Sequence, residues 1–215
     1  MGKIVLATII ISGSAKWLLN VDGNKEKWYG SDRIFMYVMT VFGAMTVNYS
    51  EQCAEYGWAV RNLRLLAGCL LAGGLLSAAY MDRRNCWVYN YVWWWCLPWA
   101  GILGLTAGGG FHGIVAVLVF VMLQQVLFSR MYGKADCHAF SVCALAECGN
   151  AVGMVGFLLQ MFLSVVLLTI VQLFRGNVTP RGRLREPQPF IPYIITAFFS
   201  VTFLESVFRT TYIYA

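Results

Sequence analysis

Long apolar runs separated by short polar clusters make up most of the chain. Two early runs cover 4–11 and 34–47, and later runs cover 65–81, 87–107, 113–128, 150–174 and 190–208. Several approach the roughly 20 residues that a helix needs to cross a bilayer. The pattern predicts an all-α, polytopic integral membrane protein with about seven or eight transmembrane or membrane-inserted helices.

The composition agrees with a membrane protein. Of the 215 residues, 59% are hydrophobic and 12% are charged, whereas a soluble domain has about 25% charged residues. The net charge of +6 comes from clusters between apolar runs, which is typical of cytoplasmic loops. We therefore attribute the charge to membrane topology and expect no nucleic-acid partner.

The seven cysteines form no CxxC pair, so a zinc ribbon or a disulfide framework is not expected. Cys137, His138 and Asp136 are too close together in sequence to supply good metal geometry from one helical turn. The sequence predicts neither a metal nor a cofactor.

Residues 1–64 are expected to form N-terminal membrane helices of uncertain role, and residues 65–215 a second, catalytic membrane domain. The run 4–11 fits either a short spanning helix or a signal-peptide core, and we favour a retained helix. The run 34–47 is followed by a polar stretch, 48–64. This part of the chain carries the least functional information.

Two aspartates stand at the polar ends of apolar runs. Asp82 follows the run 65–81 and precedes Arg83 and Arg84, and Asp136 follows the run 113–128. Two crossings separate them, so both are expected on one side of the membrane. The basic residues nearby, Arg83, Arg84, Arg130 and Lys134, make that side cytoplasmic. Taken alone, Asp82 is better explained as a solvated helix cap or a salt-bridge partner.

The rest of the chain fits the same topology. A short segment, 137–148, is expected to be tilted or only partly inserted, and 150–174 is long enough to span. A basic loop, 175–188, follows, and the last run begins with Pro187, Pro189 and Pro192.

The two aspartate segments resemble the motifs of the type IV prepilin peptidases, and the resemblance covers roughly 65–208. The first motif of that family is an aspartate followed by basic residues and Ile-Pro-Asn; here Asp82 is followed by Val88-Tyr89-Asn90 at the same spacing. The second is Gly-x-Gly-Asp, and this chain has Gly133-Lys134-Ala135-Asp136. Alanine fits the place of the second glycine only if its φ is negative. His138 stands where family members often have lysine.

The resemblance implies an intramembrane aspartyl endopeptidase of the bacterial inner or cytoplasmic membrane, linked to type IV pilus assembly or secretion. It implies that Asp82 and Asp136 are catalytic, with support from Asn90, Gly133, Lys134, Ala135 and His138. The substrate would be a prepilin-like membrane protein, cut between its basic leader and its apolar helix. Full-length relatives carry a zinc-binding cysteine segment linked with N-methylation; its absence here predicts no methyltransferase activity.

Two close carboxyl groups suit this chemistry because they cannot both ionise cheaply and therefore share a proton. One can accept a proton from water while the other donates to the scissile carbonyl oxygen. The titration belongs to the pair, so neither aspartate is assigned as the base.

Other interpretations stay open. The presenilin and signal-peptide-peptidase group also uses Gly-x-Gly-Asp, but its Pro-Ala-Leu motif is absent. A small ion- or proton-coupled transporter could use the aspartates as ion sites. A peptidase-like protein without activity would fit Tyr89 and Ala135. The remaining acids, Glu147 and Glu205, are intramembrane or boundary acids, and Glu205 is expected to pair with Arg209 four residues on.

Overall fold

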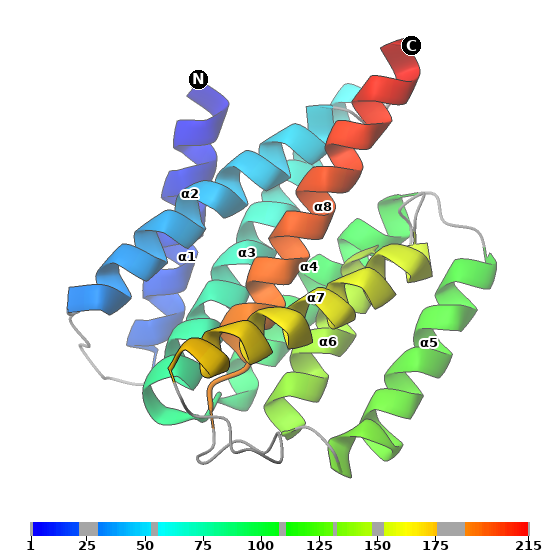
Figure 1. Ribbon diagram of the computed structural model, residues 1–215. Helices are drawn as coiled ribbons and strands as arrows, with labels where there is room; N and C mark the ends of the chain where they lie inside the picture. Colours follow the sequence, from blue (N-terminus) through cyan, green and yellow to red (C-terminus); the bar gives the residue numbers. More distant parts are fainter. Residues whose placement is uncertain are drawn as a thin grey trace.

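A computed structural model of the chain describes residues 2–21, 30–52, 56–107, 111–130, 133–147, 153–175 and 188–214 (Figure 1). These residues form helices and contain no strand. The helices are α1 (Gly2–Asn20), α2 (Gly30–Gln52), α3 (Trp58–Asn85), α4 (Asn90–Thr106), α5 (Phe111–Val126), α6 (Lys134–Glu147), α7 (Gly153–Phe174) and α8 (Ile191–Tyr214), with a 3₁₀ turn η1 (Phe128–Arg130). The predicted all-α class is confirmed.

Four helices are long and apolar enough to cross a membrane: α1, α3, the part of α7 from Val155 to Phe174, and the part of α8 from Ile191 to Phe208. A shorter apolar segment, Gly113–Val126, lies in α5. The sequence prediction of seven or eight crossings remains a prediction beyond these four.

Helix α3 is the centre of the bundle, and its glycines allow neighbouring helices to approach closely. A Cβ added at Gly73 would collide with Ser14 of α1, and one added at Gly74 would lie 2.5 Å from Cys96 Sγ of α4. At Gly68 it would lie 2.8 Å from Val47 Cγ1 of α2. Small residues at such contacts let helix backbones approach in lipid, where packing drives association.

The polar stretch 48–64 is more helical than its composition indicates. Helix α2 continues to Gln52 and α3 already begins at Trp58, seven residues before the apolar run. Polar residues remain in these helices because Glu51 and Arg64 form a buried ion pair, with Arg64 Nε 3.0 Å from Glu51 Oε1. Buried charges require such partners.

Helices α3, α5 and α7 end, and helices α4, α6 and α8 begin, at the same end of the bundle, toward the bottom of Figure 1. Asp82 lies in the last turn of α3 and Asp136 in the first turn of α6. This end of the bundle therefore contains both aspartates.

Some of the segments and side chains named in the sequence analysis lie outside the described residues. These are the start of the 150–174 run, most of the basic loop 175–188, and the side chains of Arg130 and Arg209.

Candidate active site

Asp82 is a buried carboxylate inside a helix. Asp82 is only 6% exposed. Helix α3 continues past it to Asn85, and Cys86 then ends the helix in a left-handed conformation with a φ of 51°. The Asp82 Oδ2 atom accepts a hydrogen bond of 2.9 Å from the backbone N–H of Ile191, the first residue of α8. Asp82 is thus neither an exposed cap nor a loop charge.

The adjacent arginines have other contacts. Arg83 Nε lies 2.7 Å from Asp32 Oδ1 of α2, and the Arg83 guanidinium lies over the ring of Phe35, 5.1 Å from its centroid. Arg84 Nη1 donates to the hydroxyl of Tyr80, one turn earlier, at 3.2 Å. The alternative in which Asp82 serves as the salt-bridge partner of Arg83 is therefore not supported, because that arginine pairs with Asp32.

Asp136 is held by the turn that starts α6. The backbone N–H of Gly133 donates to Asp136 Oδ2 at 3.2 Å. This contact is the acidic half of a capping box, in which a side chain in the first turn satisfies a free N–H before the helix. A Cβ added at Gly133 would lie 3.2 Å from the same oxygen. Gly133 therefore leaves the space that the Asp136 carboxylate occupies.

The two carboxyl groups interact electrostatically. Asp136 lies outside the four candidate spans, and burial raises the pKa of its carboxyl group to about 7. The charge of Asp82 adds to this rise, whereas the hydrogen bond from Gly133 opposes it. A nearby like charge favours the protonated acid. The pair can therefore hold one proton near neutral pH.

The alanine in the second motif fits its place. Ala135 lies inside the first turn of α6, and among the described residues other than glycine only Cys86 has a positive φ. The condition for replacing glycine by alanine, a negative φ, is met here. Lys134 is exposed beside it, at the first position of the helix.

Asn90 and His138 both line a neighbouring cavity of about 340 Å³. Its lining comes from three helices: Asn90, Trp93, Trp94 and Leu97 of α4, Val121 and Gln125 of α5, and His138, Ser141 and Val142 of α6. His138 faces away from Asp136, as its helical position predicts: its Nδ1 lies 3.3 Å from Gln125 Nε2, and its ring lies 6.0 Å from that of Trp93. Neither aspartate lines this cavity directly.

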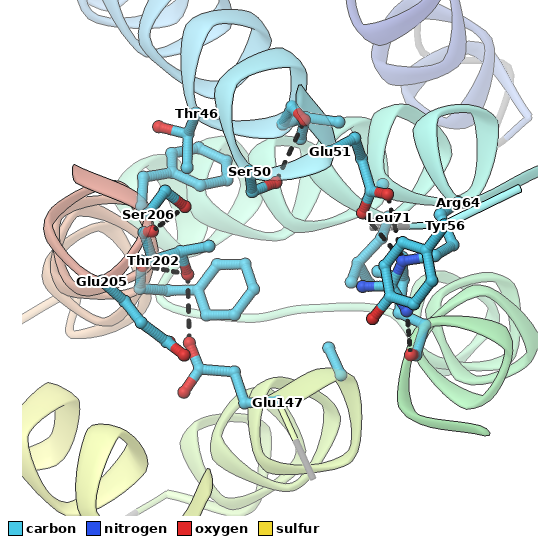
Figure 2. A pocket seen from close by; sticks show the side chains of 16 residues that line it. Thr46, Ser50, Glu51, Tyr56, Arg64, Leu71, Glu147, Thr202, Glu205 and Ser206 are labelled. Atoms are coloured by element: carbon cyan, nitrogen blue, oxygen red, sulfur yellow. Dashed lines mark hydrogen bonds and ion pairs between the residues drawn. The ribbon is translucent and has the colours of Figure 1, made fainter. Parts of the chain in front are cut away.

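Two parts of the site were missed in the sequence. The backbone of Ile191 has no recognisable side-chain signal, although Pro189 and Pro192 on either side mark the start of a helix. Gln125 lies within the apolar run 113–128, where a glutamine gives no recognisable sign of a site. Glu147, predicted as an intramembrane or boundary acid, lies outside the site at the other end of α6, where its Oε1 atom accepts a hydrogen bond of 3.0 Å from the hydroxyl of Thr202 in α8 (Figure 2).

Groups of three or more His, Cys, Asp or Glu residues that could hold a metal ion are not found within the described part of the chain. The chemistry that these residues can perform is proton transfer between two carboxyl groups and a water molecule. No protein-family model, curated protein or solved structure matches this chain, so the candidate site is interpreted from its own geometry.

Proposed function

We propose that the protein is an intramembrane aspartyl endopeptidase that cuts prepilin-like precursors at the cytoplasmic membrane boundary. The observation that carries this proposal is the placement of Asp82 in the last turn of α3 and Asp136 in the first turn of α6, at the same end of the bundle. The charge of Asp82 also adds to the raised pKa of Asp136. Asp82 is oriented by Ile191 and Asp136 by Gly133. Two fixed, interacting carboxyl groups are what an aspartyl hydrolase requires.

The proposed reaction needs no covalent intermediate. The ionised member of the pair takes a proton from water, and the resulting hydroxide attacks the scissile carbonyl carbon. The protonated member donates to the carbonyl oxygen, and the leaving amine then takes up a proton as the C–N bond breaks. Because the proton is shared, each aspartate can fill either role.

The cavity between α4, α5 and α6 supports the proposal as a place for the substrate. Its volume of about 340 Å³ lies within the range of ligand pockets, roughly 300–1,000 Å³. Trp93, Trp94 and Leu97 give it an apolar wall, and Asn90, Gln125 and His138 supply polar groups. An apolar helix with a polar segment at the membrane boundary fits such a lining.

The substrate experiment uses purified full-length protein in liposomes with a panel of prepilin-like precursors. Each precursor has a short basic leader followed by an apolar helix. We expect cleavage between leader and helix, identified by mass spectrometry of both fragments. A precursor with proline after the expected bond serves as a resistant control. Failure to cut any precursor in the panel would contradict the proposal.

A second candidate function is proton- or ion-coupled transport, and one observation favours it. Glu147 and Glu205 interact at the other end of α6 and α8, so acids occur at both ends of the bundle. The same liposomes distinguish the two functions, because a transporter would produce an Asp82-dependent proton or ion flux without any precursor. A peptidase-like protein without activity would bind precursors and leave them intact.

A further inference from the structure

Two glutamines are fully buried where α5, α6 and α7 meet. Gln124 of α5 and Gln160 of α7 are both 0% exposed. Gln124 Nε2 lies 4.0 Å from the sulfur atom of Met161, the residue after Gln160. From α6, the thiol of Cys143 interacts with Gln160. The two amide side chains therefore belong to one buried cluster at the contact of three helices, here called the glutamine cluster.

Most of the hydrogen-bonding capacity of these amides is unused by the protein. Gln124 Oε1, Gln160 Oε1 and Gln160 Nε2 are buried and have no hydrogen-bond partner within the described part of the chain. The thioether of Met161 and the thiol of Cys143 are only weak hydrogen-bonding groups. An unpartnered buried polar group is costly, and the lipid around these helices offers no partner. The three amide atoms therefore indicate a small polar ligand.

A water molecule matches these three atoms. The two amide oxygens accept hydrogen bonds, and the amide nitrogen of Gln160 donates them. Water can donate to both oxygens and accept from the nitrogen, and a buried water in a protein typically makes about three such bonds. A metal ion would leave the N–H groups of Gln160 without an acceptor, and an apolar ligand would leave all three atoms unpaired.

The glutamine cluster lies close to the aspartate site. Phe157, one helical turn before Gln160, contacts Phe140 of α6, with ring centroids 6.3 Å apart. Phe140 stands one turn after Asp136 in the same helix. One packed aromatic contact therefore joins the glutamine cluster to the turn of α6 that carries Asp136.

The inward face of α7 is polar over the second half of the helix. From Gln160 onward, the fully buried residues of this helix are Gln160, Ser164 and Gln172, and their spacings of four and eight residues place them on one face. Gln172 Nε2 donates to Gln188 Oε1 at 3.3 Å, three residues before Ile191 at the start of α8. This polar stripe leads from the glutamine cluster to the aspartate end of the bundle.

We propose that Gln124 and Gln160 hold an internal water molecule between α5, α6 and α7, and that this water supplies the hydrolysis at the aspartate pair. Each bond that is cut consumes one water, whose oxygen joins the carbonyl carbon and whose hydrogens end on the new carboxyl and amine groups. The bound water itself does not depend on the proposed function, whereas its use in cleavage rests on it.

Radiolytic footprinting of the full-length protein in liposomes detects the water. A short X-ray pulse converts bound water into hydroxyl radicals, which oxidise adjacent methionine side chains. Met161 is the reporter, because its sulfur lies 4.0 Å from Gln124 Nε2. Met36 is fully buried and Met122 is 67% exposed on the surface of α5, so they control for the dry core and for the lipid surface. We expect Met161 to be oxidised faster than both.

The double variant Gln124→Leu/Gln160→Leu keeps side chains of similar size and removes the polar atoms. Oxidation of Met161 should fall to the rate of Met36, and an unchanged rate at Met36 shows that the core stays packed. On a precursor, kcat should fall at least about fivefold, the effect of losing one net hydrogen bond, while KM stays unchanged.

Thr169→Val is the matched control, because Thr169 is exposed on α7 and its hydroxyl donates to the Val165 oxygen of its own helix. This variant should keep both the oxidation of Met161 and the wild-type kcat. Oxidation of Met161 no faster than that of Met36, or equal in wild type and double variant, would overturn the water site. Loss of this oxidation with unchanged kcat would overturn the use of the water in cleavage. Fast oxidation in a protein that cuts no precursor would support the water site and contradict the proposed function.

Discussion

The carboxylate of Asp82 accepts a 2.9 Å hydrogen bond from the backbone N–H of Ile191, 109 residues further along the chain. The bond fixes the end of α3 to the beginning of α8. A helix start has free N–H groups that favour a negative charge, so α8 can hold a buried carboxylate without a salt bridge. Asp82 is in this way kept in position for Asp136.

The pH dependence of the pair follows from Asp136. Its pKa is raised to about 7, above the value near 3.9 of an unfolded chain. We expect cleavage to fall as the pH rises through about 7, when the second carboxyl group loses its proton. The measurement is kcat/KM against pH; a rate that stays constant up to about pH 9 would contradict the shared proton.

The free energy of unfolding should also fall as the pH rises. A raised carboxyl pKa contributes stability that is complete below about pH 4 and is lost as the pH rises through about 7. Thermal unfolding of wild type and Asp136→Asn over this range measures the contribution. Asp136→Asn should lack the part of the pH dependence that belongs to Asp136.

Gly133→Ala should impair the site without unfolding the protein. The added Cβ would lie 3.2 Å from Asp136 Oδ2, so the carboxylate has to move. Since a displacement of about 1 Å can cost 100-fold in rate, we expect kcat to fall by about tenfold or more. Gly101→Ala is the control, because a Cβ there meets nothing within 4 Å. Equal activity of the two variants would contradict the positioning role of Gly133.

Arg64→Ala should be strongly destabilising. Arg64 donates to both carboxylate oxygens of buried Glu51, to the Leu103 oxygen at 2.7 Å and to Thr106 Oγ1 at 2.9 Å. Removing one partner of a buried ion pair costs about 3–5 kcal/mol.

Arg83→Ala provides the comparison. The Arg83–Asp32 pair is partly exposed, with side chains 30% and 23% accessible, and such pairs contribute about 0–1 kcal/mol. Unfolding of both variants in mixed micelles compares the two pairs. Similar losses of stability would contradict the difference in burial.

Gly73→Val tests the packing of α1 on α3. The Cβ would collide with Ser14 and approach the backbone oxygen of Ile11 to 2.9 Å, and overpacking costs about 1–3 kcal/mol. We expect α1 to separate locally from α3, measured as faster hydrogen exchange of both helices. Gly13→Ala is the control because its Cβ meets nothing within 4 Å. An unchanged exchange rate in Gly73→Val would contradict the close contact.

The all-helical class and the helices around the aspartates could be predicted from the sequence, because apolar runs and helix lengths are set by local composition. The extent of α2 and α3 could not, since the polar residues at the end of α2 and the start of α3 stay helical through the Glu51–Arg64 pair, a contact between two helices. The same holds for the site. The two motifs indicated Asp82 and Asp136. The hydrogen bond from the Ile191 backbone and the Glu147–Thr202 contact could not be predicted, because both depend on how α8 packs against other helices and not on a local sequence pattern.

The most direct test of the central claim compares precursor cleavage by the wild type, Asp82→Asn, Asp136→Asn and the control Asp32→Asn in the same liposomes. Asp32 is a suitable control because it pairs with Arg83 of α3 and is not one of the two proposed catalytic carboxyls. Since general acid–base catalysis contributes about 10²–10⁴-fold, we predict at least a hundredfold loss in each of the first two variants and near wild-type activity in the third. Cleavage that survives either Asp82→Asn or Asp136→Asn in correctly folded protein would contradict the two-aspartate mechanism.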